Sequence, residues 1–454
     1  MALTESLQAG LRHGPKRVWG TVSAVTETSV ELRGVSGLVH VGDEFTIENQ
    51  GDKPCGEILT TDMQHTKGLL FQSGAGIKVG DRVNICPPLS IRPCDDWIGK
   101  IVNFRGQSEL GDSIPQGPEE RSLYALPPPA SLRHALGPRL NTGWLCMDTL
   151  LPLCHGQRIG LFAGSGVGKS TFLASMARRV EADIVIVALI GERSREVAEF
   201  VQSGLGPEGL KRAIVVTATS GESPAVKKRA AYCAMTLAEY FRDKGKHVLL
   251  VFDSITRFAE AHRETALLAG ETPALHAFPP STVRAIAELA ERAGPGAGST
   301  GDITAIFSVL VAGSNMEEPV ADMIRGILDG HVVLSRAIAE RGRYPAIDVL
   351  QSVSRALPKA GTAEELALLS EARKILAVHE QAAPMIKAGL YEEGIDPETD
   401  RALRIWPALD AFIAGENKSA LSDAFIHLGE ILSEGKANAP QGQRNSQSEN
   451  PPDQ

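Results

Sequence analysis

The chain has 454 residues, which predicts roughly three domains at about 150 residues each. Hydrophobic residues make up 43% of the sequence and charged residues 22%, as in an ordinary soluble globular protein with a substantial core. The net charge is −9 and only 5% of the residues are aromatic. This composition argues against a general binder of nucleic-acid backbones or a base-stacking platform.

Six cysteines are scattered along the chain without a Cys-x-x-Cys pair, which favours reduced thiols over a disulfide framework or a zinc site. The first residues contain no apolar stretch of the kind that secretory signals carry. Apolar runs such as 184–190 are too short to cross a bilayer. We therefore expect a cytoplasmic protein whose membrane contact, where it occurs, is peripheral.

Two kinds of pattern occupy the N-terminal part of the chain. In residues 1–17, Leu3, Leu7 and Leu11 would share one face of a short partner-docking helix, although a frayed terminus explains them equally well. Residues 18–92 show short β-rich runs between Gly, Asp and Asn turns, which predict a small closed β-barrel without exposed edges. The expected strands are 18–25, 29–32, 44–48, 68–71 and 82–86.

Strand and helix patterns alternate through residues 93–356, which predicts a mostly parallel sheet covered by helices. Residues 357–435 are helical in pattern, and 436–454 have the composition of a disordered tail. In the alternating part, strands are expected at 157–163, 184–190, 213–217, 247–253, 303–311 and 331–334, and helices at 169–179 and 224–244. The later helices are expected at 364–375, 400–414 and 421–433.

The run Ala163-Gly-Ser-Gly-Val-Gly-Lys-Ser170 stands between an expected strand and an expected helix. Glycines let backbone N–H groups surround phosphate oxygens, and the helix N-terminus adds the positive end of its dipole. In this pattern Lys169 reaches the β- and γ-phosphates, and the Ser170 hydroxyl ligates Mg²⁺. A chance Gly-rich turn fits this strand–loop–helix context poorly. The expected nucleotide-binding residues are Gly164, Ser165, Gly166, Val167, Gly168, Lys169, Ser170 and Thr171.

Two acidic residues follow other expected strands. Asp253 ends the apolar strand 247–253 and could hold Mg²⁺ through water, or cap the helix that begins at Ser254. The P-loop upstream favours the metal role. Glu192, in Gly191-Glu-Arg-Ser-Arg-Glu196, could orient the water that attacks the γ-phosphate, while Arg193 binds phosphate or holds the carboxylate. Acidic residues in a first helical turn explain Glu196 well but Glu192 poorly.

In this order and spacing, these elements resemble the catalytic subunits of the rotary ATP synthase family. Glu318-Pro-Val-Ala-Asp322, Leu328-Asp-Gly-His331 and Tyr344-Pro-Ala-Ile-Asp-Val-Leu-Gln-Ser-Val-Ser-Arg355 carry the same resemblance. Within the family, the P-loop, the Gly191 run, Val251-Phe-Asp-Ser-Ile-Thr-Arg-Phe258 and Phe278-Pro-Pro-Ser281 are most similar to flagellum-specific type III export ATPases. The resemblance covers roughly residues 18–430.

The resemblance implies a multi-domain α/β fold with an N-terminal β-barrel, a RecA-like P-loop core and a C-terminal helical domain. It implies that Glu192 is the catalytic carboxylate, Asp253 the Walker B acid and Arg193 a phosphate-site arginine. Tyr344 would pack on adenine. Arg355 would enter the neighbouring subunit's site, where such a finger is worth about 10³-fold or more in rate. From the residues alone, the simpler interpretation of Tyr344 is a core tyrosine, and that of Arg355 is a surface ion pair.

The function implied is an Mg²⁺-dependent ATPase, a homohexameric ring that energises or gates flagellar protein export at the inner face of the cytoplasmic membrane. The implied partners are further copies of the chain, export regulator and stalk proteins, the export gate, and export substrates with their chaperones, but no nucleic acid. Four alternatives remain: a non-flagellar type III secretion ATPase, a non-catalytic ring subunit, a hexameric RNA translocase and a rotary synthase β subunit with the same chemistry. Glu192 argues against the second, and the acidic composition against the third.

Overall fold

The computed structural model describes residues 18–51, 53–273, 278–311 and 318–434. These form two compact units. The first consists of the residues up to Thr142 together with Leu153–Ala356, and the second consists of Gly143–Pro152 together with the chain from Leu357 onward. Residues 143–152, expected within the core, are therefore grouped with the C-terminal helices. The expected N-terminal helix and the expected C-terminal tail lie outside the described residues.

Six strands of the first unit close into a β-barrel in the order β1-β2-β5-β4-β3-β6, which confirms the predicted barrel. Val22, Leu32, Phe45 and Val83 fill its interior and are almost fully buried. β4 is not expected from the sequence because Glu57 is buried where an apolar side chain would normally lie. The strands are β1 (Trp19–Val25), β2 (Ser29–Arg33), β3 (Glu44–Ile47), β4 (Gly56–Thr61), β5 (Thr66–Leu70) and β6 (Arg82–Cys86).

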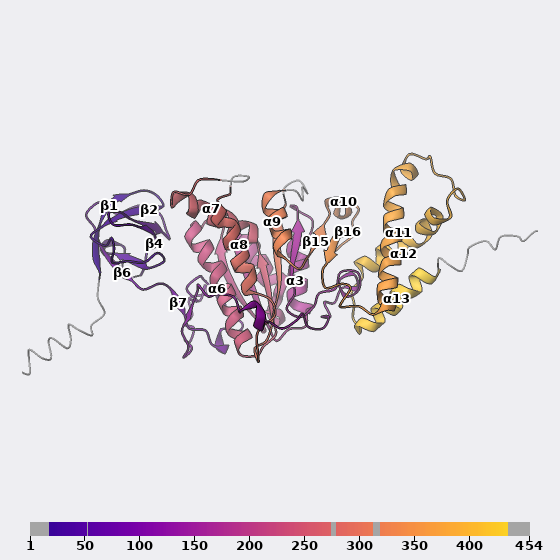
Figure 1. Cartoon of the computed structure of the whole chain (residues 1–454), viewed down its shortest axis with the longest axis horizontal. Coiled ribbons are helices and arrows are strands. Elements are labelled where there is room, and N and C mark those ends of the chain that lie inside the picture. Colours follow the sequence, from indigo (N-terminus) through magenta and orange to yellow (C-terminus); the bar gives the residue numbers. More distant parts are fainter. Residues whose placement is uncertain (1–17, 52, 274–277, 312–317, 435–454) are drawn as a thin grey trace, which may run out of the picture. The chain divides into compact units, whose positions relative to one another are not determined.

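The core of the first unit is an eight-stranded sheet in the order β16-β15-β10-β14-β13-β11-β12-β8, parallel except for the β15–β16 pair (Figure 1). This sheet confirms the predicted parallel α/β core. Sequence patterns do not reveal β16, in which Ser352 and Ser354 are buried while Val353 is exposed, nor the two-residue β8. The strands are β8 (Ile101–Val102), β10 (Arg158–Ala163), β11 (Ile184–Glu192), β12 (Ala213–Thr219), β13 (Val248–Asp253), β14 (Ile303–Leu310), β15 (Gly330–Leu334) and β16 (Ile347–Ser354).

Helices follow most strands of this sheet and pack against it (Figure 1). They are α3 (Lys169–Arg179), α4 (Ser194–Glu199), α5 (Gly206–Leu210), α6 (Pro224–Asp243), α7 (Ile255–Leu268), α8 (Pro280–Arg292), α9 (Pro319–Ile327) and α10 (Arg336–Glu340). A π-helical segment, Phe200–Leu205, joins α4 to α5, and the short strands β7 (Ser90–Ile91) and β9 (Arg121–Ser122) pair separately. Because β10, β11 and β13 run in parallel, their carboxyl ends meet at one edge of the sheet.

A buried network of charges joins the barrel to helix α6. Arg229 is fully buried, and its guanidinium donates to the carboxylates of Glu44 on β3 and Glu57 on β4. Arg105 forms a two-pronged contact with Glu44, 3.0 Å on each side, and the ammonium of Lys228 lies 3.4 Å from Glu57. Each buried carboxylate thus faces two cations, which offsets the cost of removing it from water.

The second unit consists of α2 (Leu145–Asp148), α11 (Ala363–Lys387), α12 (Pro397–Ala414) and α13 (Leu421–Glu434). A capping box between Thr362 and Glu365 begins α11, which continues past Pro384 and is much longer than its sequence pattern indicates. The unit buries Leu369, Phe412 and other apolar side chains between its helices. Within the described residues, every helix is too short or too polar to cross a membrane.

Replacing Arg229 by Met would remove the central cation of the barrel–core network and leave Glu44 and Glu57 buried with fewer partners. We expect the free energy of unfolding to fall by about 3–5 kcal/mol, the range found when one partner of a buried ion pair is removed. Denaturant unfolding of the purified chain measures the change. Arg284→Met is the matched control, because Arg284 is exposed on α8 and pairs with Glu288 one turn away. Equal stability of the two variants would contradict a stabilising role.

Candidate functional site

The P-loop joins β10 to α3 at the carboxyl edge of the sheet. Gly168 precedes the helix with a φ of 86°, a conformation that only glycine adopts without strain. A Cβ atom on Gly168 would lie 3.3 Å from the Tyr344 ring, so this ring lies directly over the end of the loop. Val167 is buried and anchors the loop, whereas four polar or glycine positions are exposed: Ser165, Gly166, Ser170 and Thr171. The loop is therefore open to a ligand.

Three charged side chains converge beside the P-loop. The Lys169 ammonium contacts Oδ1 of Asp253 and lies 3.4 Å from Oε1 of Glu192. The Asp253 carboxylate is 2% exposed and also accepts a hydrogen bond from the Ser308 hydroxyl on β14. Three residues that lie far apart in the sequence thus meet because β10, β13 and β11 end at the same edge.

The backbone at the end of β11 turns Glu192 toward this cluster. The pairing of β11 with β12 shifts register between Ile190 and Glu192, and Gly191 between them has a φ of 74°. A Cβ on Gly191 would lie 2.8 Å from the Cβ of Arg257 on α7, so a larger residue has neither the conformation nor the space. This irregularity places a carboxylate beside Lys169.

The environment of Glu192 raises the pKa of its carboxyl to about 7. Burial is the largest cause, and the negative charge of Asp253 adds to it, while the Lys169 ammonium acts in the opposite direction. A carboxyl that titrates near neutral pH is suited to accept a proton from water, because a general base works best when its pKa lies near the operating pH.

Two other predicted residues lie near the site in different ways. Tyr344 is half exposed, with its ring against Gly168, so it is not a core tyrosine. Arg193 caps α4, and its guanidinium extends into solvent and pairs with Glu196 at 3.2 Å. The structure therefore brings Lys169, Glu192 and Asp253 together but leaves the Arg193 side chain outside their cluster.

Arg355 lies at the other edge of the sheet. β16 begins at Ile347, whose partner Leu334 pairs in turn with Ala163 at the P-loop, and it ends at Ser354 opposite Gly330. The eight residues of this strand span about 25 Å, more than an arginine side chain can bridge. Arg355 is exposed there and donates to the carbonyl of Arg325 at 3.3 Å. It cannot reach the P-loop of its own chain.

The structure adds residues that the sequence did not single out. Ser308 binds Asp253, Arg257 packs against Gly191, and Arg336 on α10 donates to the carbonyl of Ser165 at 3.2 Å. A hydroxyl within the apolar run 303–311 could have indicated Ser308, and Arg257 belongs to a run that the family resemblance already used. No local pattern identifies Arg336, since its contact depends on how two distant segments fold together.

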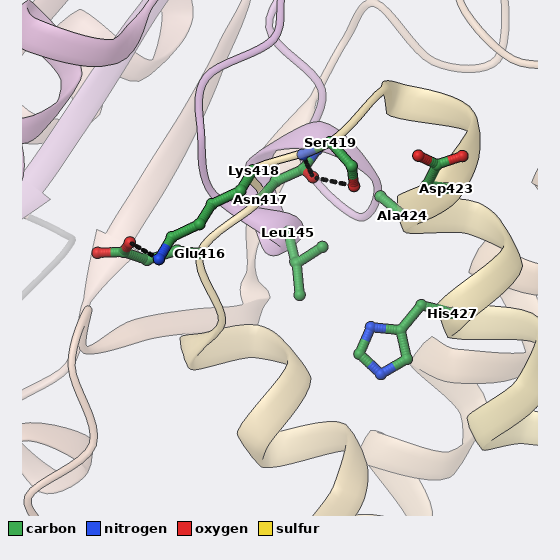
Figure 2. A pocket seen from close by; sticks show the side chains of 8 residues that line it. All are labelled: Leu145, Glu416, Asn417, Lys418, Ser419, Asp423, Ala424 and His427. Atoms are coloured by element: carbon green, nitrogen blue, oxygen red, sulfur yellow. Dashed lines mark hydrogen bonds and ion pairs between the residues drawn. The ribbon is translucent and has the colours of Figure 1, made fainter.

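A cavity of about 540 Å³ lies within the second unit, between α13, the loop that precedes it and Leu145. Figure 2 shows Lys418 extended toward Glu416, and Ser419 bonded to the Asn417 side chain. None of its described lining residues belongs to the P-loop or to the charge cluster. It is therefore not part of the candidate nucleotide site.

Known families match both units of the chain. The ATP synthase alpha/beta family, nucleotide-binding domain, matches residues 143–354, and the T3SS EscN ATPase C-terminal domain matches residues 362–424. A flagellum-specific ATP synthase of Caulobacter vibrioides is 42% identical over 433 residues, which cover 93% of this chain and 97% of that protein. The chain belongs to the flagellum-specific ATP synthase family. The predicted family and fold class are thereby confirmed.

Solved structures agree with this assignment. The assembled ATPase EscN from the enteropathogenic E. coli type III secretion system matches with a TM-score of 0.83 and 36% identity, over 91% of this chain and 100% of that one. EscN in complex with its central stalk EscO matches with a TM-score of 0.81, at the same identity and coverage. As a member of this family, the chain is an ATP-hydrolysing enzyme of flagellar protein export, and the relatives favour this branch over the non-flagellar alternative.

The pKa of Glu192 predicts how stability depends on pH. Folding raises this pKa from its ordinary value of 4.5 to about 7, so the folded chain keeps a proton that the unfolded chain has released. Stability from this group is therefore present at low pH and is lost as the pH rises through about 7. Glu192→Gln removes the titration. We expect the difference in thermal midpoint between the nucleotide-free wild type and Glu192→Gln, taken as wild type minus variant, to decrease as the pH is raised from 5 to 8.

Glu208→Gln is the control for this comparison, because Glu208 is an exposed carboxylate on α5 that pairs with Lys211. Its difference from the wild type should stay nearly constant over the same range. If the Glu192 difference were equally flat, Glu192 would not titrate near neutral pH.

Proposed function

We propose that the chain binds ATP with Mg²⁺ at its P-loop and hydrolyses it within a ring, where Arg355 of each subunit completes the site of its neighbour. The observation that carries this proposal is the position of Lys169 between Glu192 and Asp253 at an accessible P-loop. A triphosphate that enters the loop would replace the two carboxylates as the partner of the lysine. Glu192 and Asp253 are then released for water and metal.

The donor set fits Mg²⁺, which prefers oxygen ligands. Asp253 offers a buried carboxylate, and Ser170 offers a hydroxyl in the first turn of α3. An ion held by these residues would supply positive charge to neutralise the phosphate oxygens during hydrolysis. The hydrogen bond from Ser308 to Asp253 fixes the carboxylate, so its orientation does not depend on the lysine.

Glu192 would act as the general base or as the group that orients the attacking water. Its carboxyl lies at the mouth of the P-loop on a backbone bulge that fixes its direction. Its raised pKa gives it enough basicity to accept a proton near neutral pH. Arg193 and Tyr344 would contribute to phosphate and adenine binding, and Tyr344 already lies against the loop.

Arg355 supports a ring rather than a monomer. Its place at the amino edge of the sheet separates it from the P-loop of its own chain by the length of β16. A second copy could instead bring this guanidinium to the transition-state charge, as trans arginine fingers do. The related EscN was solved as an assembly and with its stalk EscO. By analogy, a homohexamer with a stalk, at the cytoplasmic face of the membrane and in contact with export substrates, is the proposed setting.

Glu192→Gln should abolish turnover while ATP binding persists. The amide has nearly the shape of the carboxylate but cannot accept a proton, so the chemical step should slow by about 10²-fold or more. Phosphate release measures turnover, and a fluorescent ATP analogue measures binding. Lys169→Ala is the reference variant that should lose both. Retained hydrolysis in Glu192→Gln would exclude Glu192 as the base.

Mixing two inactive variants tests the trans finger. Lys169→Ala destroys the phosphate site but keeps Arg355, whereas Arg355→Ala keeps the phosphate site but lacks the finger. Mixed rings contain interfaces at which an intact P-loop meets an intact arginine, so part of the activity should return. The measurement is ATPase rate against mixing ratio, with sizing to verify ring formation. Rings that mix yet stay inactive at every ratio would contradict a role in trans.

A further inference from the structure

The segment between β15 and β16 contacts the P-loop at two points. Arg336, the first residue of α10, donates from Nη2 to the carbonyl oxygen of Ser165 at 3.2 Å. Tyr344, at the other end of the segment, lies over Gly168. One continuous segment thus touches the first turn of the loop and its last residue.

A P-loop binds phosphate only if its backbone N–H groups point inward, which requires its carbonyl groups to point outward. The Arg336 guanidinium lies on the outer side and binds one of these carbonyls. Hydrogen bonds from a charged donor are shorter and stronger than neutral ones. The contact therefore favours the orientation of the Ser165–Gly166 peptide that a phosphate needs.

A cavity of about 90 Å³ lies next to this contact and is lined by Gly164, Ser335 and Gln351, among others. Within the described ranges, no carboxylate forms an ion pair with Arg336, so its charge is not committed elsewhere. The hydrogen bond to Ser165 is therefore the contact through which the Arg336 guanidinium acts on the loop.

We propose that Arg336 is a positioning residue that holds the first turn of the P-loop in its phosphate-binding conformation without touching the phosphates. This role presupposes the nucleotide site proposed above. Backbone N–H groups of a P-loop surround the phosphates that ATP and ADP share. Loss of the contact should therefore weaken ATP and ADP equally and leave the chemical step almost unchanged.

Arg336→Met removes the donor and the charge but keeps most of the apolar stem. The Kd values of fluorescent ATP and ADP analogues, measured with the full chain, should both rise about threefold to tenfold, as expected for the loss of one hydrogen bond. KM should rise by a similar factor, and kcat should stay within about twofold of the wild type. Arg336→Lys, which keeps a charged donor, should recover most of the affinity.

Arg284→Met, an exposed arginine on α8, is the matched control and should bind both nucleotides like the wild type. Weaker ATP binding with unchanged ADP binding would mean that Arg336 contacts the γ-phosphate, which overturns the proposal. A fall in kcat at constant KM would overturn it as well. Unchanged affinity in Arg336→Met beside lost affinity in Lys169→Ala would refute only the role of Arg336. Unchanged affinity in both would refute the nucleotide site itself.

Discussion

One lysine holds together the charges at the edge of the sheet. Glu192 and Asp253 belong to different strands and would repel one another if the Lys169 ammonium did not lie between them. β14 separates the lysine's strand from that of Asp253, and its Ser308 hydroxyl fixes the aspartate from the side. Burial and the nearby charge of Asp253 raise the pKa of Glu192 to about 7, so protonation of this glutamate relieves part of the repulsion near neutral pH. A triphosphate at the P-loop would compete with both carboxylates for the Lys169 ammonium.

The order and direction of the strands determine which residues can reach Lys169. Parallel strands bring three sequence-distant residues to one edge, whereas the antiparallel β16 carries Arg355, the residue that follows it, to the opposite edge. One sheet therefore presents the two halves of a site on two sides that cannot meet within one chain. Tyr344, in the segment that precedes β16, remains with the P-loop. Because β16 alone runs antiparallel, Arg355 lies at the edge opposite Lys169 and Tyr344, where it could serve only the site of a neighbouring subunit.

Sequence reasoning succeeded where the signal is local. The P-loop, the strand that precedes it and the helix α3 follow from short patterns of glycine and apolar residues, and the barrel follows from its turns. It missed β4, because the buried charge of Glu57 is neutralised by cations from elsewhere in the chain. It also missed Ser308 and Arg336, whose contacts join segments more than fifty residues apart. Patterns within a short window report which face of an element is apolar, but not which distant group lies opposite.

Two charge clusters in the first unit have the same chemistry and opposite consequences. Arg229, between Glu44 and Glu57, is fully buried, so its ion pairs fix how β3 and β4 lie on α6. Lys169 lies between two carboxylates in the same way but beside exposed loop residues, so an anion can compete for it. Removing a cation from a buried cluster destabilises the fold, because the remaining carboxylates lose their partner. At an accessible cluster, a ligand can take over the cation without destabilising the fold. Burial, rather than the kind of residue, therefore separates the structural cluster from the one suited to bind nucleotide.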